Sequence, residues 1–286
     1  MCFTIERPMP PIWIMYPHIS LYSIGWRMGY GETYKYDLAE WKDTLSTEEK
    51  KKYDEFFPSP VFWRNIYDDD FNENDFDKYN YELITFWEEQ GKPKYSISSL
   101  ANETNALEFL CFWKPNHQIV DESCLSQLQY SEFVVDIHDF ISAEQYIMVE
   151  KARLFEDEEI EQQILDTKDP TEVTSLGQKV KNFKQDIWDR VKYSIVLTAN
   201  YYKFTQNKAL REFLLSTENK ILVEANPLDK IWGVGLSSES SNIHLPSSWK
   251  GENLLGFALM EVRDEIKRIY KHYDKINWSK INEKYN

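Results

Sequence analysis

The chain has 286 residues, of which 42% are hydrophobic and 15% aromatic, enough for a folded soluble protein with a substantial core. Its formal net charge of −15 at pH 7 excludes non-specific duplex DNA binding, because that affinity comes from phosphate neutralisation by Lys and Arg. Three cysteines argue against a disulfide framework, and the spacing of Cys111, His117 and Cys124 does not match that of zinc ligands. With no signal peptide and no stretch approaching the ~18 apolar residues of a membrane span, we expect a cytoplasmic protein without membrane contact, metal or cofactor.

Residues 1–98 are expected to form an N-terminal extension of helices and loops, either a separate module or a cover over a pocket. Residues 1–35 are too aromatic for a solvated linker, which predicts an aromatic-packed loop that packs on the rest of the chain. The aromatic residues are Trp13, Tyr16, Tyr22, Trp26 and Tyr30. Arg27 lies among three glycines and is a candidate anion-binding residue.

The remainder of the extension predicts two helices joined by an acidic connection. The first covers residues 37–57, with Ser46 as a second N-cap ahead of Glu49. The acidic residues 68–77 lack the Gly and Glu that a calcium loop needs, so we interpret them as an exposed connection. The second helix covers residues 77–90 and ends before Pro93.

The strands predicted for the rest of the chain are few and short. An apolar run at residues 106–113 is typical of a buried strand, and residues 220–224 predict another. Residues 133–141 predict a small hairpin that turns near Asp136 and His138.

From Glu144 onward the chain is predicted to be mostly helical. A first helix begins at Ser142, and a second carries Ile160 and Ile164. We expect a third from Asp169 to Gly177, a fourth from Lys184 to Thr198, a fifth that begins at Asn207, and a last one from Asn253 to about His272. The expected fold is therefore mainly α with a few short β-strands, and residues 99–286 form its catalytic domain.

The helix that begins at Ser142 carries two chemically active side chains. Ser142 and Gln145 form a capping box, which places Glu144 in the first turn, where free N–H groups and the helix dipole favour its ionised form. Lys151 lies seven residues on, within about 20° of the same face and about 10.5 Å along the axis. A small substrate fits between the two, although a surface helix with a capping acid and a solvated lysine would look the same in sequence.

A second unusual stretch runs from Asp229 to Gly235. Its glycines allow the backbone to pass close to a bound ring, Trp232 offers a stacking face, and Asp229 can accept hydrogen bonds from hydroxyls. A core turn anchored by the tryptophan is the equally weighted alternative.

A series of segments shares its order and spacing with a known family from about residue 106 to about residue 270. The segments are Glu144–Phe155, Asp169-Pro170, Leu176-Gly177, Val180–Phe183, Ile187-Trp188, Lys203-Phe204, Leu222–Ala225, Asp229–Gly235, Trp249–Gly256 and Ala258–Arg263. Together they resemble the NADAR family of YbiA-like N-glycosidases. The chain departs from the family pattern at Gln145, at Glu150 and in the segment Ser126–Tyr130, the last of which concerns the pocket wall.

The resemblance implies a YbiA-like fold and cleavage of an N-glycosidic bond between ribose and a base. It implies Glu144, Lys151 and Asp229 as catalytic residues. The resemblance also implies substrate-binding candidates, which are Trp188, Trp232, Gly233, Asn253, Ser126 and Gln127. Lys181 and Lys203 are candidate cations for a pyrophosphate. The implied substrates are ADP-ribose on guanine, in a nucleotide or single-stranded nucleic acid, or phosphoribosylated pyrimidine intermediates of riboflavin synthesis.

The chemistry of the two helix residues agrees with this activity. Breaking an N-glycosidic bond builds positive charge at the anomeric carbon, which a fixed carboxylate at Glu144 would stabilise. Lys151 would either hydrogen-bond the ribose or leaving group, or attack an opened ribose aldehyde to form a Schiff base, which requires a lowered pKa. Removal of ADP-ribose from guanine is the leading hypothesis; the alternatives are hydrolysis of a riboflavin intermediate and a non-catalytic ADP-ribose-binding module.

Overall fold

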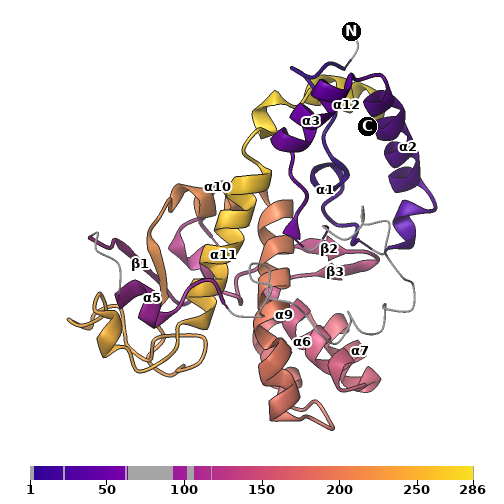
Figure 1. Ribbon diagram of the computed structural model, residues 1–286. Coiled ribbons are helices and arrows are strands. Elements are labelled where there is room, and N and C mark those ends of the chain that lie inside the picture. Colours follow the sequence, from indigo (N-terminus) through magenta and orange to yellow (C-terminus); the bar gives the residue numbers. More distant parts are fainter. Residues whose placement is uncertain are drawn as a thin grey trace. The chain divides into compact units, whose positions relative to one another are not determined.

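The computed structural model describes residues 3–21, 23–61, 63, 93–101, 106–116 and 118–285 (Figure 1). It divides into a first unit, Met1–Phe71, Val135–His138 and Glu265–Asn286, and a second unit, Asn72–Val134 and Asp139–Asp264. The predicted acidic connection, the helix over residues 77–90, Tyr22 and His117 lie outside the described residues. The division at residue 98 and the packing of the extension on the catalytic domain stay predictions.

The first unit is more helical than the sequence predicted. Its elements are α1 (Ile12–Met15), η1 (Ile24–Trp26), α2 (Tyr30–Asp43), α3 (Thr47–Phe56), η6 (Tyr273–Lys275) and α12 (Trp278–Tyr285). The prediction of a loop over residues 1–35 is therefore wrong in part. The helical structure predicted over residues 37–57, with a second N-cap at Ser46, is confirmed and consists of two helices. Ser46 explains the break, since its side chain and Glu49 form the predicted reciprocal capping box, which starts α3 anew.

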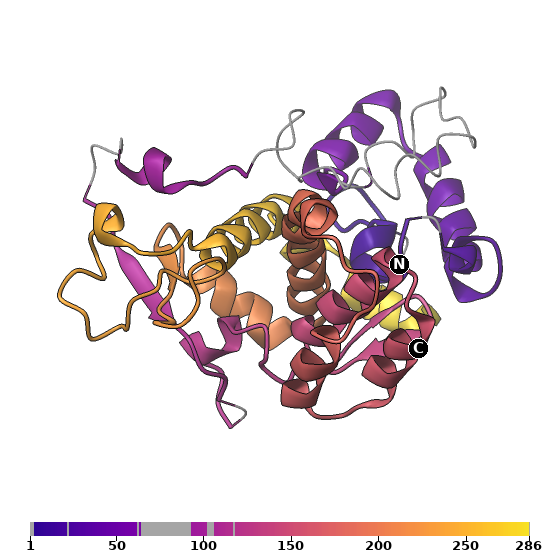
Figure 2. The same ribbon diagram turned by 90° about the horizontal axis from the view of Figure 1, so that it is seen from below.

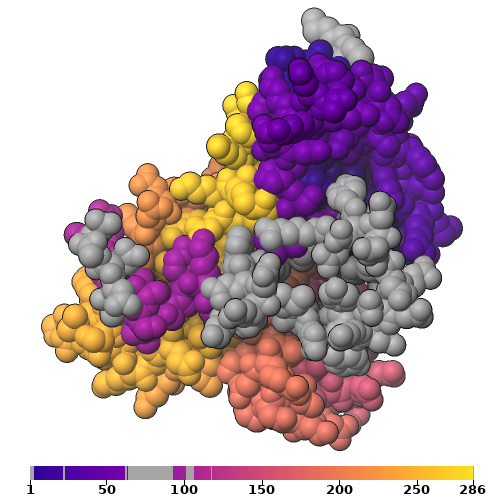
Figure 3. All heavy atoms as spheres, in the orientation of Figure 1, coloured from indigo at the N-terminus to yellow at the C-terminus, as the bar shows by residue number. Residues whose placement is uncertain are grey.

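Aromatic contacts and the C-terminal helix hold this unit together. The rings of Trp13 and Trp26 both pack against Trp63, with centroids 6.0 and 5.7 Å away. The hydroxyl of Tyr285 on α12 donates to Asp37 on α2 over 2.7 Å. Figure 3 shows the yellow C-terminal residues beside the indigo and purple N-terminal ones. The two ends of the chain thus share one small core.

The second unit contains a two-stranded parallel sheet. β1 (Phe109–Phe112) pairs with β4 (Ile221–Glu224) so that Phe112 stands opposite Glu224, which confirms both predicted strands. Because the strands are parallel, their carboxyl ends meet at one edge, where ligands commonly bind in α/β sheets. The predicted hairpin is also confirmed: β2 (Phe133–Val135) pairs with β3 (His138–Phe140), and Asp136 in the turn has a φ of 54°.

Helices make up most of the second unit, which confirms the mainly α class. They are α5 (Ile97–Ala101), η4 (Glu122–Leu125), α6 (Ala143–Leu154), α7 (Glu158–Asp166), α8 (Pro170–Gly177), α9 (Gln185–Gln206), α10 (Lys208–Ser216), η5 (Pro246–Ser248) and α11 (Leu254–Ile269). α6 packs against α7, α8 and α9 (Figures 1 and 2). α9 runs to Gln206 rather than to Thr198, because its last two turns are buried on most sides and packing extends it.

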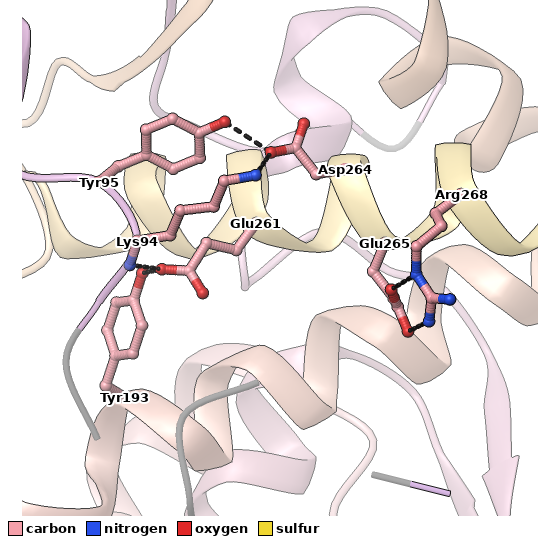
Figure 4. Close-up of polar contacts among 7 residues, drawn as sticks. All are labelled: Lys94, Tyr95, Tyr193, Glu261, Asp264, Glu265 and Arg268. Atoms are coloured by element: carbon pink, nitrogen blue, oxygen red, sulfur yellow. Dashed lines mark hydrogen bonds and ion pairs between the residues drawn. The ribbon is translucent and has the colours of Figure 1, made fainter. Parts of the chain in front are cut away.

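α11 carries buried polar side chains as well as its predicted apolar face. Leu255, Leu259, Val262, Ile266 and Ile269 are all buried, as expected. Glu261 accepts hydrogen bonds from the Lys94 N–H (2.6 Å) and the Tyr193 hydroxyl (2.8 Å), as Figure 4 shows. Burial raises the pKa of Glu261 to about 7. Within the described part of the chain, no helix has the length and apolar character that crossing a bilayer requires.

Candidate active site

A cavity of about 430 Å³ opens in the second unit, a volume within the range of small-molecule sites. Its wall is built by the residues after β1, the loop before β2, α6, the end of α8, the start of α9 and the loop after β4. The charged side chains that line it are Lys114, Glu144, Lys151, Glu224 and Asp229. The β4 end and the α6 helix therefore face one space.

The start of α6 is fixed by a cap that differs in part from the prediction. Ser142 is the N-cap, and its hydroxyl accepts the Gln145 N–H over 3.2 Å, as expected. The Gln145 side chain does not return to Ser142: its oxygen accepts the Ile141 N–H, and its amide donates to carbonyls of Ile164 and Thr167. Gln145, fully buried, thus ties α6 to the end of α7, so this departure from the family pattern supports the site from behind.

Glu144 lies in the first turn of α6 and lines the cavity. Its backbone N–H donates to the Gln127 carbonyl (3.0 Å), and its carboxylate accepts the Thr174 hydroxyl from α8 (3.0 Å). Burial raises the pKa of Glu144, with Asp229 acting in the same direction; the Thr174 hydrogen bond and Lys151 act against it. The sequence predicted that the position at the helix start would favour the ionised form of Glu144. In the structure, burial has the larger effect on the pKa of this carboxyl group.

Lys151 lines the same cavity, so α6 does place both side chains on one face. Its ammonium donates to the Gly177 carbonyl over 2.9 Å and lies over the rings of Phe183 and Trp188, 4.5 and 5.6 Å from their centroids. Burial lowers the pKa of Lys151, and Glu144 only partly opposes this. A lowered pKa is what a nucleophilic amine requires.

Gly177 ends α8 where that helix touches α6. A Cβ there would stand 2.1 Å from the Met148 sulfur and 2.7 Å from its Cγ, so only glycine fits without a shift of Met148. This close approach brings the Gly177 carbonyl to Lys151 and the Thr174 hydroxyl to Glu144. α8 thus holds both candidate catalytic side chains.

The loop after β4 places Asp229 and Trp232 on the cavity wall. One Asp229 oxygen accepts the N–H groups of Ile231 and Trp232 over 2.8 and 2.9 Å, which makes the turn rigid. Trp232 is partly exposed to the cavity, which favours the stacking interpretation over the core turn. Gly233 lies behind it, where an added Cβ would stand 3.0 Å from the Glu224 carbonyl.

Aromatic and amide side chains complete the wall. Trp188 at the start of α9 is buried and lines the cavity, as does Trp113 after β1, which sequence reasoning did not single out. Ser126 and Gln127 also line it, and the Gln127 side-chain oxygen is buried without a hydrogen-bond partner among the described residues. Such an orphan polar atom is suited to a ligand.

Gly233 and three further predicted substrate-binding residues of the second unit do not line this cavity. Asn253 is fully buried behind β4, where both its polar atoms bond backbone groups. Lys203 is fully buried, donates to the carbonyls of Cys124 and Ser126, and has a pKa lowered by burial to about 8. Lys181 is exposed and paired with Glu159. Arg27 is exposed in the first unit.

The cations predicted for a pyrophosphate, Lys181 and Lys203, thus do not line the cavity, whereas another cation does. Lys114, directly after β1, lines the wall, with its ammonium 4.6 Å from the centroid of the Trp113 ring. The only signal in the sequence was its position directly after a predicted strand.

Glu224 is a second charged lining residue, besides Lys114, that sequence reasoning missed. It ends β4, and its position at the carboxyl edge of the sheet, inside the family-like segment Leu222–Ala225, could have indicated it. Among the described residues, no three His, Cys, Asp or Glu side chains are grouped so as to hold a metal ion. The cavity therefore offers carboxyl, amine and aromatic groups to a ligand.

Several known proteins with related sequences are named N-glycosidases. An N-glycosidase of Acanthamoeba polyphaga mimivirus is 44% identical over 128 residues, which cover 44% of this chain and 75% of the relative. The N-glycosidase YbiA of Shigella flexneri is 30% identical over 132 residues, 46% of this chain and 74% of the relative. The chloroplastic riboflavin biosynthesis protein PYRR of Zea mays is 34% identical over 112 residues, 38% of this chain and 16% of the relative.

These relatives place the chain among the hydrolases that cleave N-glycosidic bonds, which confirms the predicted enzyme class. The NADAR domain matches residues 111–267, more than half of the chain, and the chain belongs to the NADAR family. The matched range contains every charged residue of the cavity wall.

Proposed function

We propose that the chain hydrolyses the N-glycosidic bond between ADP-ribose and guanine, in a nucleotide or a single-stranded nucleic acid. The observation that carries the proposal is that Glu144 and Lys151 line one cavity together with Trp113, Trp188 and Trp232.

The groups on the wall match the parts of such a substrate. Tryptophan faces suit the stacking of guanine or adenine, and Asp229 suits the ribose hydroxyls. Lys114 is the cavity cation that suits the pyrophosphate. Glu144 would stabilise the positive charge that builds at the anomeric carbon as the bond to the base breaks.

Lys151 supports a covalent route through this site. Its lowered pKa leaves more of the neutral amine, which would bond to the anomeric carbon as the bond to the base breaks and the base departs with its electron pair; opening of the ribose ring then gives a Schiff base. A Schiff base formed in this way would be hydrolysed by water, which regenerates the amine and releases ADP-ribose.

A phosphoribosylated pyrimidine intermediate of riboflavin synthesis is the second candidate substrate. The similarity to the riboflavin biosynthesis protein of Zea mays favours it. It has the same ribose–nitrogen bond, so the same residues would serve, and the cytoplasmic location expected from sequence suits either substrate.

The test offers ADP-ribosylated guanosine, ADP-ribosylated single-stranded DNA and the phosphoribosylamino pyrimidine side by side and follows base release by mass. The proposal expects the fastest release from the two guanine substrates. Faster release from the pyrimidine would favour the second candidate, and binding of ADP-ribose with no release from any substrate would leave only a binding module.

A further inference from the structure

Glu224 projects into the cavity from a backbone that is fixed on both sides. Its N–H donates to the Asn253 side-chain oxygen over 3.0 Å, and its carbonyl accepts the Val234 N–H over 3.0 Å. On the other side, β4 pairs with β1, where Phe112 stands opposite Glu224. The side chain therefore starts from a rigid point at the carboxyl edge of the sheet.

Of the three carboxyl groups on the cavity wall, the one at Glu224 accepts no hydrogen bond from any residue that the structure describes. Its Oε2 atom is buried without a hydrogen-bond partner among the described residues. Glu144 is instead bound by the Thr174 hydroxyl, and Asp229 by two backbone N–H groups. A buried carboxylate without a donor is costly, so this group favours its neutral, protonated form.

The two lysines of the cavity wall do not stabilise an ionised Glu224. Lys151 donates to the Gly177 carbonyl, and Lys114 lies against the Trp113 ring; neither forms an ion pair with Glu224 in the described structure. Burial raises the pKa of Glu224 to about 8, with Asp229 and Glu144 adding to the effect. Two neighbouring acids whose environments differ in this way are suited to different roles in one reaction.

We propose that Glu224 is the general acid that protonates the departing base. This rests on the proposed function. As the bond between the anomeric carbon and nitrogen breaks, the electron pair stays on the nitrogen, which takes the proton from Glu224. Water adds its oxygen to the anomeric carbon and gives one proton to the Glu224 carboxylate, which restores the acid. Glu144, whose carboxylate form is favoured by the Thr174 hydroxyl and by Lys151, stabilises the charged ribose.

The test compares the pH profile of base release for the wild type, Glu224→Gln and the control Glu261→Gln. Glu261 is also a buried glutamate with a raised pKa in the second unit, but it does not line the cavity. In the wild type and the control, kcat/KM should fall above about pH 8, where Glu224 loses its proton. Glu224→Gln should lose about 100-fold or more at neutral pH and should lack this fall.

Two results would overturn the proposal. One is a Glu224→Gln variant that keeps activity within a few-fold of wild type; the other is a fall above pH 8 that persists in this variant. A measurement without substrate separates the proposal from the proposed function: the carboxyl carbon signal of labelled Glu224, assigned by its loss in Glu224→Gln, should titrate near 8. If base release fails but this signal titrates as expected, only the proposed function falls; a signal titrating near the ordinary value of 4.5 overturns the acid role.

Discussion

Replacing Asn253 with alanine should destabilise the second unit by removing two hydrogen bonds behind the cavity. The side-chain oxygen accepts the Glu224 N–H over 3.0 Å, and the amide donates to the Leu222 carbonyl over 2.9 Å. Each buried backbone group left without a partner costs about 1–3 kcal/mol, so the two together cost about 2–6 kcal/mol. That is a large part of the ~5–15 kcal/mol by which folded domains are stable.

The backbone conformation of Asn253 adds a second, separable cost. Its φ is 56°, a region that alanine adopts at a cost of about 1–2 kcal/mol. Asn182→Ala is the matched control, because Asn182 has the same φ of 56° and is exposed. Urea denaturation of both variants gives the hydrogen-bond contribution by difference, and hydrogen exchange at the Glu224 amide shows whether the end of β4 has opened.

The reasoning would be refuted if Asn253→Ala lost no more stability than Asn182→Ala. If Asn253→Ala raised KM strongly and left the free energy of unfolding unchanged, Asn253 would instead contact the substrate, as the resemblance implied. The structure instead predicts lost stability and faster exchange at Glu224.

Three further outcomes are expected. Borohydride reduction during turnover should leave a ribosyl adduct on Lys151, absent in Lys151→Met; an unmodified wild type that still turns over would argue against the covalent route. Asp229→Asn and Trp232→Ala should weaken ADP-ribose binding as well as turnover, measured by calorimetry, and unchanged affinity would remove them from the binding wall. The folded protein holds the Glu224 proton up to about pH 8, whereas the unfolded chain holds it only up to about pH 4.5. The free energy of unfolding should therefore fall as the pH rises between these two values, and this fall should be smaller in Glu224→Gln.

Local signals in the sequence predicted much of the second unit. The sequence predicted the caps at Ser142 and Asp169, the end of α8 at Gly177 and the apolar face of α11. Each of these features depends on residues within a few positions of one another. The common face of Glu144 and Lys151 follows from helix periodicity alone.

The sequence could not show which polar groups are buried or where they point. Lys203 looked like a cation for phosphate, but the fold buries it against two backbone carbonyls. The opposite error occurred at Glu224 and Lys114, which reach the cavity only because β1 and β4 pair in parallel across more than a hundred residues of chain. Long-range pairing and desolvation are properties of the folded state, and they decided the roles of these side chains.

The most direct test of the central claim is single-turnover base release by Glu144→Gln. Glu150→Gln is the matched control, since Glu150 lies on the same helix but pairs with Arg153 and does not line the cavity. The account predicts that Glu144→Gln folds normally and is about 100-fold slower or more, as expected for ~2.7–4 kcal/mol from one preorganised group, while Glu150→Gln stays near wild type. A folded Glu144→Gln variant that releases base within a few-fold of the wild-type rate would contradict it.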